Sequence, residues 1–268
     1  VGGIEKYFQI VKCFRDEDLR ADRQPEFTQL DMELSFVNEE QVIGVIEAML
    51  RDVIPSVFGA EFPAEVPRIT YRDAMERFGL DAPDMRYEME LRDVAELGRE
   101  SEFKVFHTVL ESGGRVKALA VPGGAQLSRK DIDDLTEWVG RSFGAKGLAW
   151  MKHEESGLKS AITKFFSEGL LEKLSGELGT KNGDIVFFGA GREDIEHATL
   201  GNLRKRLAAK LGDVPAGARS YAWVTDFPLF ERDPSTKELY SVHHPFTSPR
   251  PEDLPILADP ERMKTEGH

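Results

Sequence analysis

Three side chains with complementary binding chemistry recur at every second position of one short segment. Phe27, Gln29 and Asp31 alternate with residues such as Leu30 and Met32, and a period of two puts the two sets on opposite faces of a β-strand. An aromatic ring can stack on a flat base, an amide can orient a polar ligand, and a carboxylate can hold an ammonium group. The alternation predicts a polar binding face opposite an apolar core face. A half-exposed sheet face with one packed Phe is the alternative.

An arginine lies where a preceding apolar segment becomes highly charged. Arg15 is followed by a stretch rich in both acidic and basic residues that runs to Glu26. A guanidinium at this point can clamp a phosphate or a carboxylate through two parallel hydrogen bonds. The alternative is a surface ion pair with Asp16 or Asp18, and such exposed pairs are common and weak.

Two adjacent histidines form a second candidate. His243 and His244 stand side by side before a proline, and neighbours on a strand point to opposite faces, so metal chelation by the pair is not expected. No cysteine and no suitably spaced third ligand lie nearby, and we expect no metal ligands in this chain. The imidazoles can instead donate hydrogen bonds to an anionic substrate. A turn with one packed histidine is the alternative.

The binding face requires two strands and the connection between them. The apolar pattern predicts a first strand over about 7–15 and a second over 27–37. The charged connection over 16–26 exceeds the roughly two to five residues of ordinary hairpin loops. Its length and charge predict a binding element, with a plain solvated loop as the alternative.

Local signals place the helices that follow. Asn38 with Gln41 forms a capping-box pattern ahead of apolar residues at helical spacing. Pro55 is expected to end that helix, because proline lacks the N–H that a helix interior uses. A shorter helix is expected from about Thr70, and a turn or loop over 81–86.

The pattern of expected secondary structure changes between about 103 and 212, where short strands alternate with helices. Strands are expected at 115–121, 147–151 and 184–189, and helices at 128–141, 159–174 and 194–211. The basic cluster at 204–206 is expected to be a solvated helix face. Strand-like sequence resumes at 220–230, so this α+β or α/β module is expected to be an insertion.

The composition limits the classes of protein to which the chain can belong. The 268 residues are 40% hydrophobic and 31% charged, which is typical of a globular protein. The formal charge of −13 is a mild argument against a general nucleic-acid coat protein. One cysteine excludes an intramolecular disulfide and favours a reducing compartment. No apolar run approaches the roughly 20 residues of a membrane span, and no complete dinucleotide, phosphate-loop or nucleophile-elbow motif occurs.

One segment carries a family resemblance. Residues 14–31, Phe-Arg-Asp-Glu-Asp-Leu-Arg-Ala-Asp-Arg-Gln-Pro-Glu-Phe-Thr-Gln-Leu-Asp, closely resemble the second class-defining motif of bacterial-type aspartyl-tRNA synthetases, which are class II aminoacyl-tRNA synthetases. Class II enzymes for asparagine and lysine share its Phe-Arg start but not the charged run. Residues 81–86 are similar to the family's Ser-Asp-Lys-Pro-Asp-Leu-Arg stretch, with Ala82 where lysine is usual and Leu80 for serine. Residues 223–229 and 243–249 look like later segments of the catalytic core.

The resemblance implies the fold and the reaction. It implies an α+β chain: part of a class II antiparallel-sheet catalytic core over 1–102, an inserted α/β-type GAD domain over 103–214, and a second, incomplete part of the core over 215–268. The implied reaction is a cytoplasmic, ATP-dependent ligation. Aspartate is activated to aspartyl-adenylate and then transferred to the 3′ end of the aspartate tRNA. Whether the asparagine tRNA is also a substrate stays open.

The resemblance also implies roles for single residues. It assigns ATP binding to Arg15, Asp16, Glu17, Gln24 and Phe27, aspartate binding to Arg15, Gln29, Asp31, His243 and His244, and contact with the tRNA acceptor end to Arg20 and Arg23. Arg15 would be the catalytic residue at the α-phosphate. Phe27 would stack on adenine, and Asp31 would take the α-ammonium group of aspartate.

Family segments that the sequence does not contain shape the remaining expectations. They include the anticodon-binding domain, the first motif with its dimer interface, the Mg²⁺-binding acidic segment and the third motif. We therefore expect a homodimer in the full-length enzyme and Mg²⁺ ligands outside this chain. The 268 residues alone are expected to show little or no aminoacylation. A non-catalytic tRNA-binding or regulatory paralogue is the alternative, and an asparagine-specific relative is disfavoured by the loop residues and the inserted module.

Overall fold

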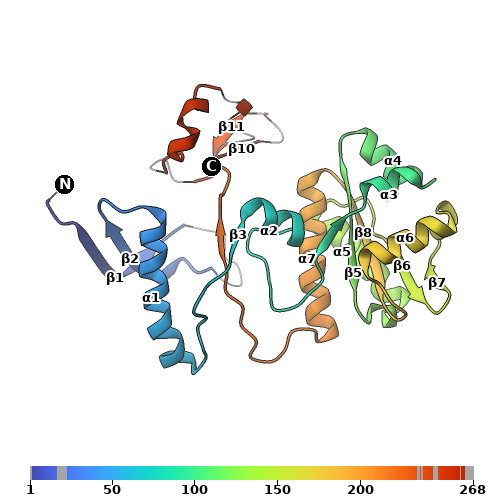
Figure 1. Ribbon diagram of the computed structural model, residues 1–268, viewed down its shortest axis with the longest axis horizontal. Coiled ribbons are helices and arrows are strands. Elements are labelled where there is room, and N and C mark those ends of the chain that lie inside the picture. The colour runs from blue at the N-terminus through green and yellow to red at the C-terminus, as the bar shows by residue number, and fades with distance from the viewer. Residues whose placement is uncertain are drawn as a thin grey trace. The chain divides into compact units, whose positions relative to one another are not determined.

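The chain folds into two compact units. The computed structural model describes residues 2–16, 23–233, 236, 238–243, 247–259 and 261–262, and it divides the chain into Val1–Glu65 and Val66–His268 (Figure 1). Three residues with predicted roles, Glu17, Arg20 and His244, lie outside the described residues.

A β-hairpin dominates the first unit, as predicted. Strand β1 (Lys6–Phe14) and strand β2 (Glu26–Leu34) pair antiparallel, with Lys6 opposite Leu34 and Phe14 opposite Glu26. Of the two faces of the hairpin, the one expected to face the core is the more exposed to solvent among the described residues. Its Ile10 is 74% and its Leu30 39% exposed. The face that carries Phe27, Gln29 and Asp31 is half-buried.

Helix α1 (Glu39–Phe58) follows the hairpin. Its predicted capping box is confirmed, because Asn38 and Gln41 bond each other's backbone N–H. The prediction that Pro55 ends the helix is wrong, since α1 continues to a left-handed Gly59. Proline removes only its own N–H, and the Ser56 hydroxyl bonds the Asp52 carbonyl at 2.6 Å within the same turn.

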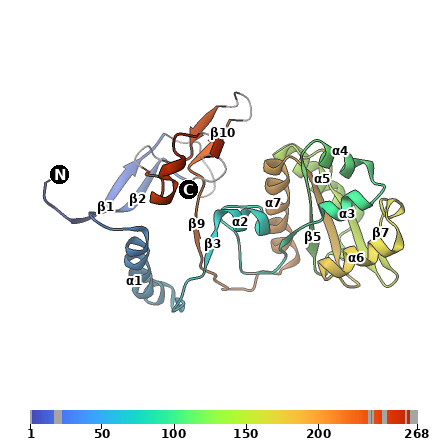
Figure 2. The same ribbon diagram turned by 45° about the horizontal axis from the view of Figure 1, so that its top comes forward.

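In the second unit, a short strand ahead of the inserted sequence pairs with a short strand that follows it. Strand β3 (Arg68–Thr70) lies parallel to strand β9 (Trp223–Thr225), with Thr70 opposite Thr225 (Figures 1 and 2). Helix α2 (Tyr71–Phe78) starts directly after β3, close to the start predicted near Thr70, and the Thr70 hydroxyl caps it. Residues 91–211, here called the inserted module, lie in sequence between these strands.

The inserted module contains a five-stranded sheet. Its order is β4 (Leu91–Asp93), β5 (Arg115–Val121), β8 (Ile185–Gly191), β6 (Ala149–Glu154) and β7 (Gly157–Lys159). All four pairings are antiparallel, so the module is α+β, one of the two types that the alternation left open, and not the α/β type that the resemblance implied. Strands β5 and β6 run in the same direction, but β8 lies between them in the opposite one. Strand β4 already belongs to this sheet, ahead of residue 103.

Helices cover both faces of this sheet (Figures 1 and 2). One core packs Leu119 and Phe187 against α5 (Arg129–Phe143) and α7 (Glu193–Leu211). The other packs Val186 and Phe188 against α3 (Ala95–Glu100), α4 (Lys104–Glu111) and α6 (Glu168–Leu178). Alternate residues of one strand thus serve opposite cores, at about 1.5–3 kcal/mol for each large apolar side chain buried.

Two predicted elements are shorter than expected. The helix expected over 159–174 starts at Glu168, capped by Ser167, because the preceding residues form β7 and a short 3₁₀ turn, Thr163–Phe165. The strand expected over 220–230 divides into β9 and β10 (Phe230–Arg232), which pairs with β11 (Leu239–Ser241). A last 3₁₀ helix spans Pro251–Ile256. Among the described helices, none combines the length and apolar character that crossing a membrane requires.

Candidate functional site

The hairpin brings the predicted binding residues onto one face. The guanidinium carbon of Arg15 lies 5.2 Å from the centre of the Phe27 ring, and the Arg15 N–H donates to the Pro25 carbonyl at 2.9 Å. Gln29 and Asp31 follow Phe27 along the same half-buried face. A cation, an aromatic ring, an amide and a carboxylate therefore follow one another along one face of the hairpin, and the alternation predicted the last three.

Two residues of β1 complete this face and were missed from the sequence. Gln9 lies opposite Asp31 and donates its amide to the carboxylate at 3.0 Å. Cys13 lies opposite Phe27, and its thiol meets the Gln29 amide oxygen at 3.4 Å. Only the strand register could have identified them, because partners across a hairpin share a face.

The far end of the same face is hollow and acidic. A cavity of about 420 Å³ is lined by Tyr7, Gln9, Asp31 and Glu33 together with residues at the start of the chain and at the end of β2. Two carboxylates in one small hollow favour a cationic group over an anionic one. The arginine end and the carboxylate end of the hairpin thus suit opposite charges.

The loop end of the hairpin supplies the remaining described candidates. Asp16, Arg23 and Gln24 are all exposed. On the opposite face of β1, Lys12 forms an exposed ion pair with Glu26 at 2.8 Å, and such a pair contributes little to stability.

His243 belongs to the second unit, where it ends a row of rings. Its imidazole lies 5.9 Å from Phe227, and Phe227 lies 5.1 Å from Tyr71. The described residues with predicted roles therefore lie in two places, on the hairpin and after β11.

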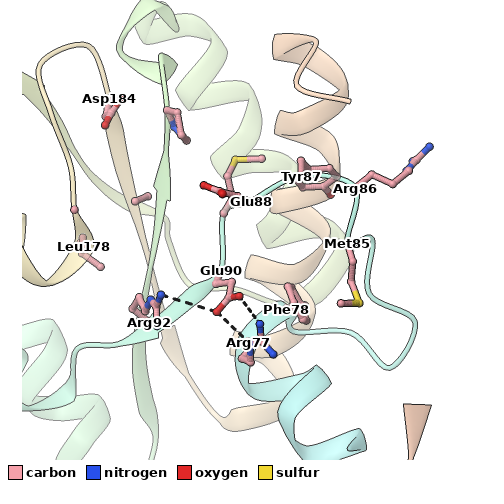
Figure 3. Close-up of a pocket in the computed structure, with 14 residues that line it drawn as sticks. Arg77, Phe78, Met85, Arg86, Tyr87, Glu88, Glu90, Arg92, Leu178 and Asp184 are labelled. Carbon is pink, nitrogen blue, oxygen red and sulfur yellow. Dashed lines mark hydrogen bonds and ion pairs between the residues drawn. The ribbon is translucent and has the colours of Figure 1, made fainter. Parts of the chain in front are cut away.

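A larger cavity lies in the second unit (Figure 3). Its volume is about 650 Å³, and the segment over 85–90 forms much of its wall. Arg77 from α2 bonds both carboxylate oxygens of Glu90, at 2.5 and 3.1 Å, and Arg92 lies 3.9 Å from the same carboxylate. The segment over 81–86 is irregular, as predicted.

Arg204 of α7 fixes this segment from the other side. The residue is 1% exposed and donates to the carbonyls of Met89 and Tyr87 at 2.8 and 3.0 Å. Its guanidinium also lies over the rings of Tyr87 and Phe78, and burial lowers its pKa. The expectation of a solvated face is wrong for Arg204. Its spacing from Leu200, Leu203 and Leu207 places it on the buried stripe of the helix.

A buried charge cluster joins α2 to the module. Lys117 is 1% exposed, and its ammonium lies 2.7 Å from the Glu76 carboxylate and 3.3 Å from His197 Nε2. Burial raises the pKa of Glu76, but hydrogen bonds from Arg115 and Lys117 outweigh it and bring that pKa to about 2. Ligand atoms of Glu76, Glu193 and His197 lie within 4.8 Å of one another, yet the Lys117 ammonium already provides the positive charge there.

Comparisons with known proteins extend over almost all of this chain. The family described as tRNA synthetases class II (D, K and N) matches residues 1–266. The chain is 49% identical over 270 residues to an aspartate–tRNA ligase of Staphylococcus carnosus (strain TM300), covering 100% of the chain and 46% of that relative. It is 48% identical over 267 residues to an aspartate–tRNA(Asp/Asn) ligase of Natranaerobius thermophilus, covering 99% and 46%.

A third relative gives the same result. The chain is 49% identical over 258 residues to an aspartate–tRNA(Asp/Asn) ligase of Persephonella marina, covering 96% of the chain and 42% of the relative. The chain thus spans less than half the length of these curated relatives. Because the family match covers nearly every residue of both units, the chain belongs to the class II tRNA synthetases of the D, K and N group.

Proposed function

We propose that this chain is part of an aspartate–tRNA ligase. The enzyme activates L-aspartate with ATP and transfers the aspartyl group to the 3′ end of the aspartate tRNA. The observation that carries the proposal is the hairpin face, where Arg15, Phe27, Gln29 and Asp31 are aligned. Relatives that bear this activity in their names are 45–49% identical to the chain.

The arginine end of the hairpin suits the nucleotide. A carboxylate oxygen of aspartate attacks the α-phosphorus of ATP, pyrophosphate leaves, and a mixed anhydride forms. Arg15 would stabilise the charge that develops on the α-phosphate, and Phe27 would stack on adenine. Glu17 would contact the adenine end of ATP, and Asp16 and Gln24 would help to hold the nucleotide. Such transfers depend on positioning and charge stabilisation rather than on a covalent nucleophile.

The carboxylate end of the hairpin suits the amino acid. Asp31 would bind the α-ammonium group of aspartate in the acidic hollow that it shares with Glu33. Gln9 supports this role, since its amide holds the Asp31 carboxylate in one orientation. Gln29 would also contact aspartate, and His243 and His244 would close over it.

Mg²⁺ is the usual companion of ATP in this chemistry. The clustered ligand atoms among the described residues do not fit it, because Mg²⁺ prefers six oxygen ligands and this cluster contains an imidazole beside an ammonium. The Mg²⁺ ligands would then lie outside this chain.

The domain roles follow the same proposal. Residues 1–102 and 215–268 would form parts of the catalytic core, and 103–214 would be the GAD insertion. Pairing of β3 with β9 on either side of the inserted module supports an insertion within the core, while β4 starts the module's sheet at Leu91, ahead of residue 103. The loop carrying Arg20 and Arg23 would meet the tRNA acceptor end in a cytoplasmic homodimer. Two relatives named for both tRNA(Asp) and tRNA(Asn) make the asparagine tRNA the second substrate to test.

Pyrophosphate exchange tests this proposal in the full-length protein that contains this chain. Aspartate, and not asparagine or lysine, should support the exchange of pyrophosphate into ATP. Arg15→Ala should reduce the rate by about 10²–10³, as removal of one transition-state charge donor does. Lys12→Ala is the matched control, because it removes a cation from the opposite face of the same hairpin. Absence of exchange together with retained tRNA binding would support the non-catalytic paralogue instead.

A further inference from the structure

His243 is one end of a row of three partly buried rings. Its imidazole meets Phe227 nearly edge to face, with ring planes at 81°, and Phe227 packs on Tyr71 at 47°. Tyr71 is the first residue of α2, and Phe227 follows β9. Because β3 and β9 are parallel with Thr70 opposite Thr225, the chain leaves both strands at the same edge. The strand pairing therefore brings Tyr71 and Phe227 together.

A strained turn orients Phe227. The preceding residue, Asp226, has a φ of 60°, in the left-handed region that few non-glycine residues adopt. Its carboxylate accepts a hydrogen bond from the Thr225 hydroxyl at 2.7 Å and is ion-paired with Arg250. Strain of this kind persists where surrounding contacts over-determine the backbone, and it clusters at functional sites.

The backbone of His243 is fixed separately from its ring. Val242 N–H donates to the Leu229 carbonyl at 3.2 Å, and the Ser241 hydroxyl donates to the His243 carbonyl at 3.0 Å. Among the described residues no hydrogen bond reaches the imidazole nitrogens, so the contact with Phe227 sets the plane of the ring.

We propose that Phe227 is a positioning residue that holds the His243 imidazole in the orientation in which it contacts aspartate. This inference rests on the proposed function, in which His243 contacts the amino acid. The positive edge of one ring favours the negative face of the other, which restricts rotation of the imidazole before the substrate arrives. A group held in place loses less entropy on binding. Loss of Phe227 should therefore weaken aspartate binding and leave ATP binding unchanged.

Steady-state exchange kinetics of the full-length protein test this role. Phe227→Leu should raise the KM for aspartate by about three- to tenfold, as expected for loss of one ring contact, while the KM for ATP and the kcat stay within about twofold. Phe227→Tyr keeps the ring and should restore the KM. Phe143→Leu is a matched control, since Phe143 packs on Trp138 inside the inserted module.

The decisive comparison uses His243→Ala. If Phe227 acts through His243, adding Phe227→Leu to His243→Ala should raise the aspartate KM no further. An equal increase in both backgrounds, an unchanged KM in Phe227→Leu, or failure of Phe227→Tyr to restore it would overturn the inference. An unchanged aspartate KM in His243→Ala would overturn it as well, with the ligase proposal intact. Absence of aspartate-dependent exchange in the unsubstituted protein would instead overturn the proposed function.

Discussion

Glu196 should make the stability of the second unit fall as the pH rises from about 4.5 to about 7. Its side chain is buried, and neither carboxylate oxygen has a hydrogen-bond partner among the described residues. Burial raises the pKa of Glu196 from 4.5 to about 7. Burial likewise lowers the pKa of His197 to about 4. Between pH 5 and 6 both groups are therefore neutral, and their 3.6 Å approach is not an ion pair.

The sign of the effect follows from the two pKa values of Glu196. Well below pH 4.5 the carboxyl is protonated in both the folded and the unfolded chain, and it makes no difference to stability. As pH rises, the unfolded chain releases the proton first, so the free energy of unfolding falls until the folded pKa near 7 is passed. At about 1.4 kcal/mol per pKa unit, the full loss is on the order of 3 kcal/mol.

Burial is the largest contribution to the pKa of Glu196, and four charged groups that face the carboxyl make the next contributions. Lys117 and Arg115 lower the pKa of Glu196, whereas Glu76 and Asp93 raise it. Glu196→Gln cannot ionise, so this variant should lack the loss of stability between about pH 4.5 and 8. Relative to the unsubstituted chain it should gain on the order of 3 kcal/mol across that interval. The His197 titration is common to both proteins and cancels in the difference.

Urea denaturation followed by tryptophan fluorescence gives the required free energies. Trp138 and Trp150 both pack against the core that contains α7, so they report on the module that holds Glu196. Glu172→Gln on α6 is the matched control, because Glu172 is exposed. Parallel pH profiles for Glu196→Gln and the unsubstituted chain would refute the assignment of a protonated, buried carboxyl.

Two further predictions concern how α7 holds its neighbours, and both are measured by thermal and urea unfolding. Gly201→Ala should cost about 1–3 kcal/mol, because a Cβ there would lie 2.7 Å from the Gly79 carbonyl oxygen, whereas Gly176→Ala, with open space around it, should be neutral or stabilising. Equal effects of the two would contradict the close helix contact. Arg204→Met should cost on the order of 2–5 kcal/mol, because it leaves two loop carbonyls without their donor. The exposed Lys205→Met should change stability by less than about 0.5 kcal/mol, and similar losses from both would show that Arg204 is not an anchor.

Local chemistry explains which elements could be predicted from the sequence. The cap at Asn38 was indicated by Gln41 three positions on, and the helices expected from about 70 and 128 start there, capped by Thr70 and Ser128. The hairpin was predictable for a similar reason, since alternation along one strand is a local property. Phe27, Gln29 and Asp31 share a face whatever the rest of the chain does.

Features that depend on distant partners could not be predicted in this way. Gln9 joins the predicted binding face only through the register of the hairpin. Arg204 is buried because loop carbonyls from far along the chain need a donor. The antiparallel sheet of the inserted module likewise depends on β8 entering between two strands that run in the same direction. Pro55 was misjudged because the helix tolerates the loss of a single N–H.

The pairing of β3 with β9 has a consequence for the order of folding. These strands have three residues each and are separated in sequence by the whole inserted module. Closing a flexible loop of about 150 residues costs on the order of 4 kcal/mol in chain entropy, which so short a ladder offsets poorly. A module that has already folded shortens the effective loop, so we expect this pairing to form late. Phe227 and His243 would then be set in place last, and ring packing around His243 would report completion of folding.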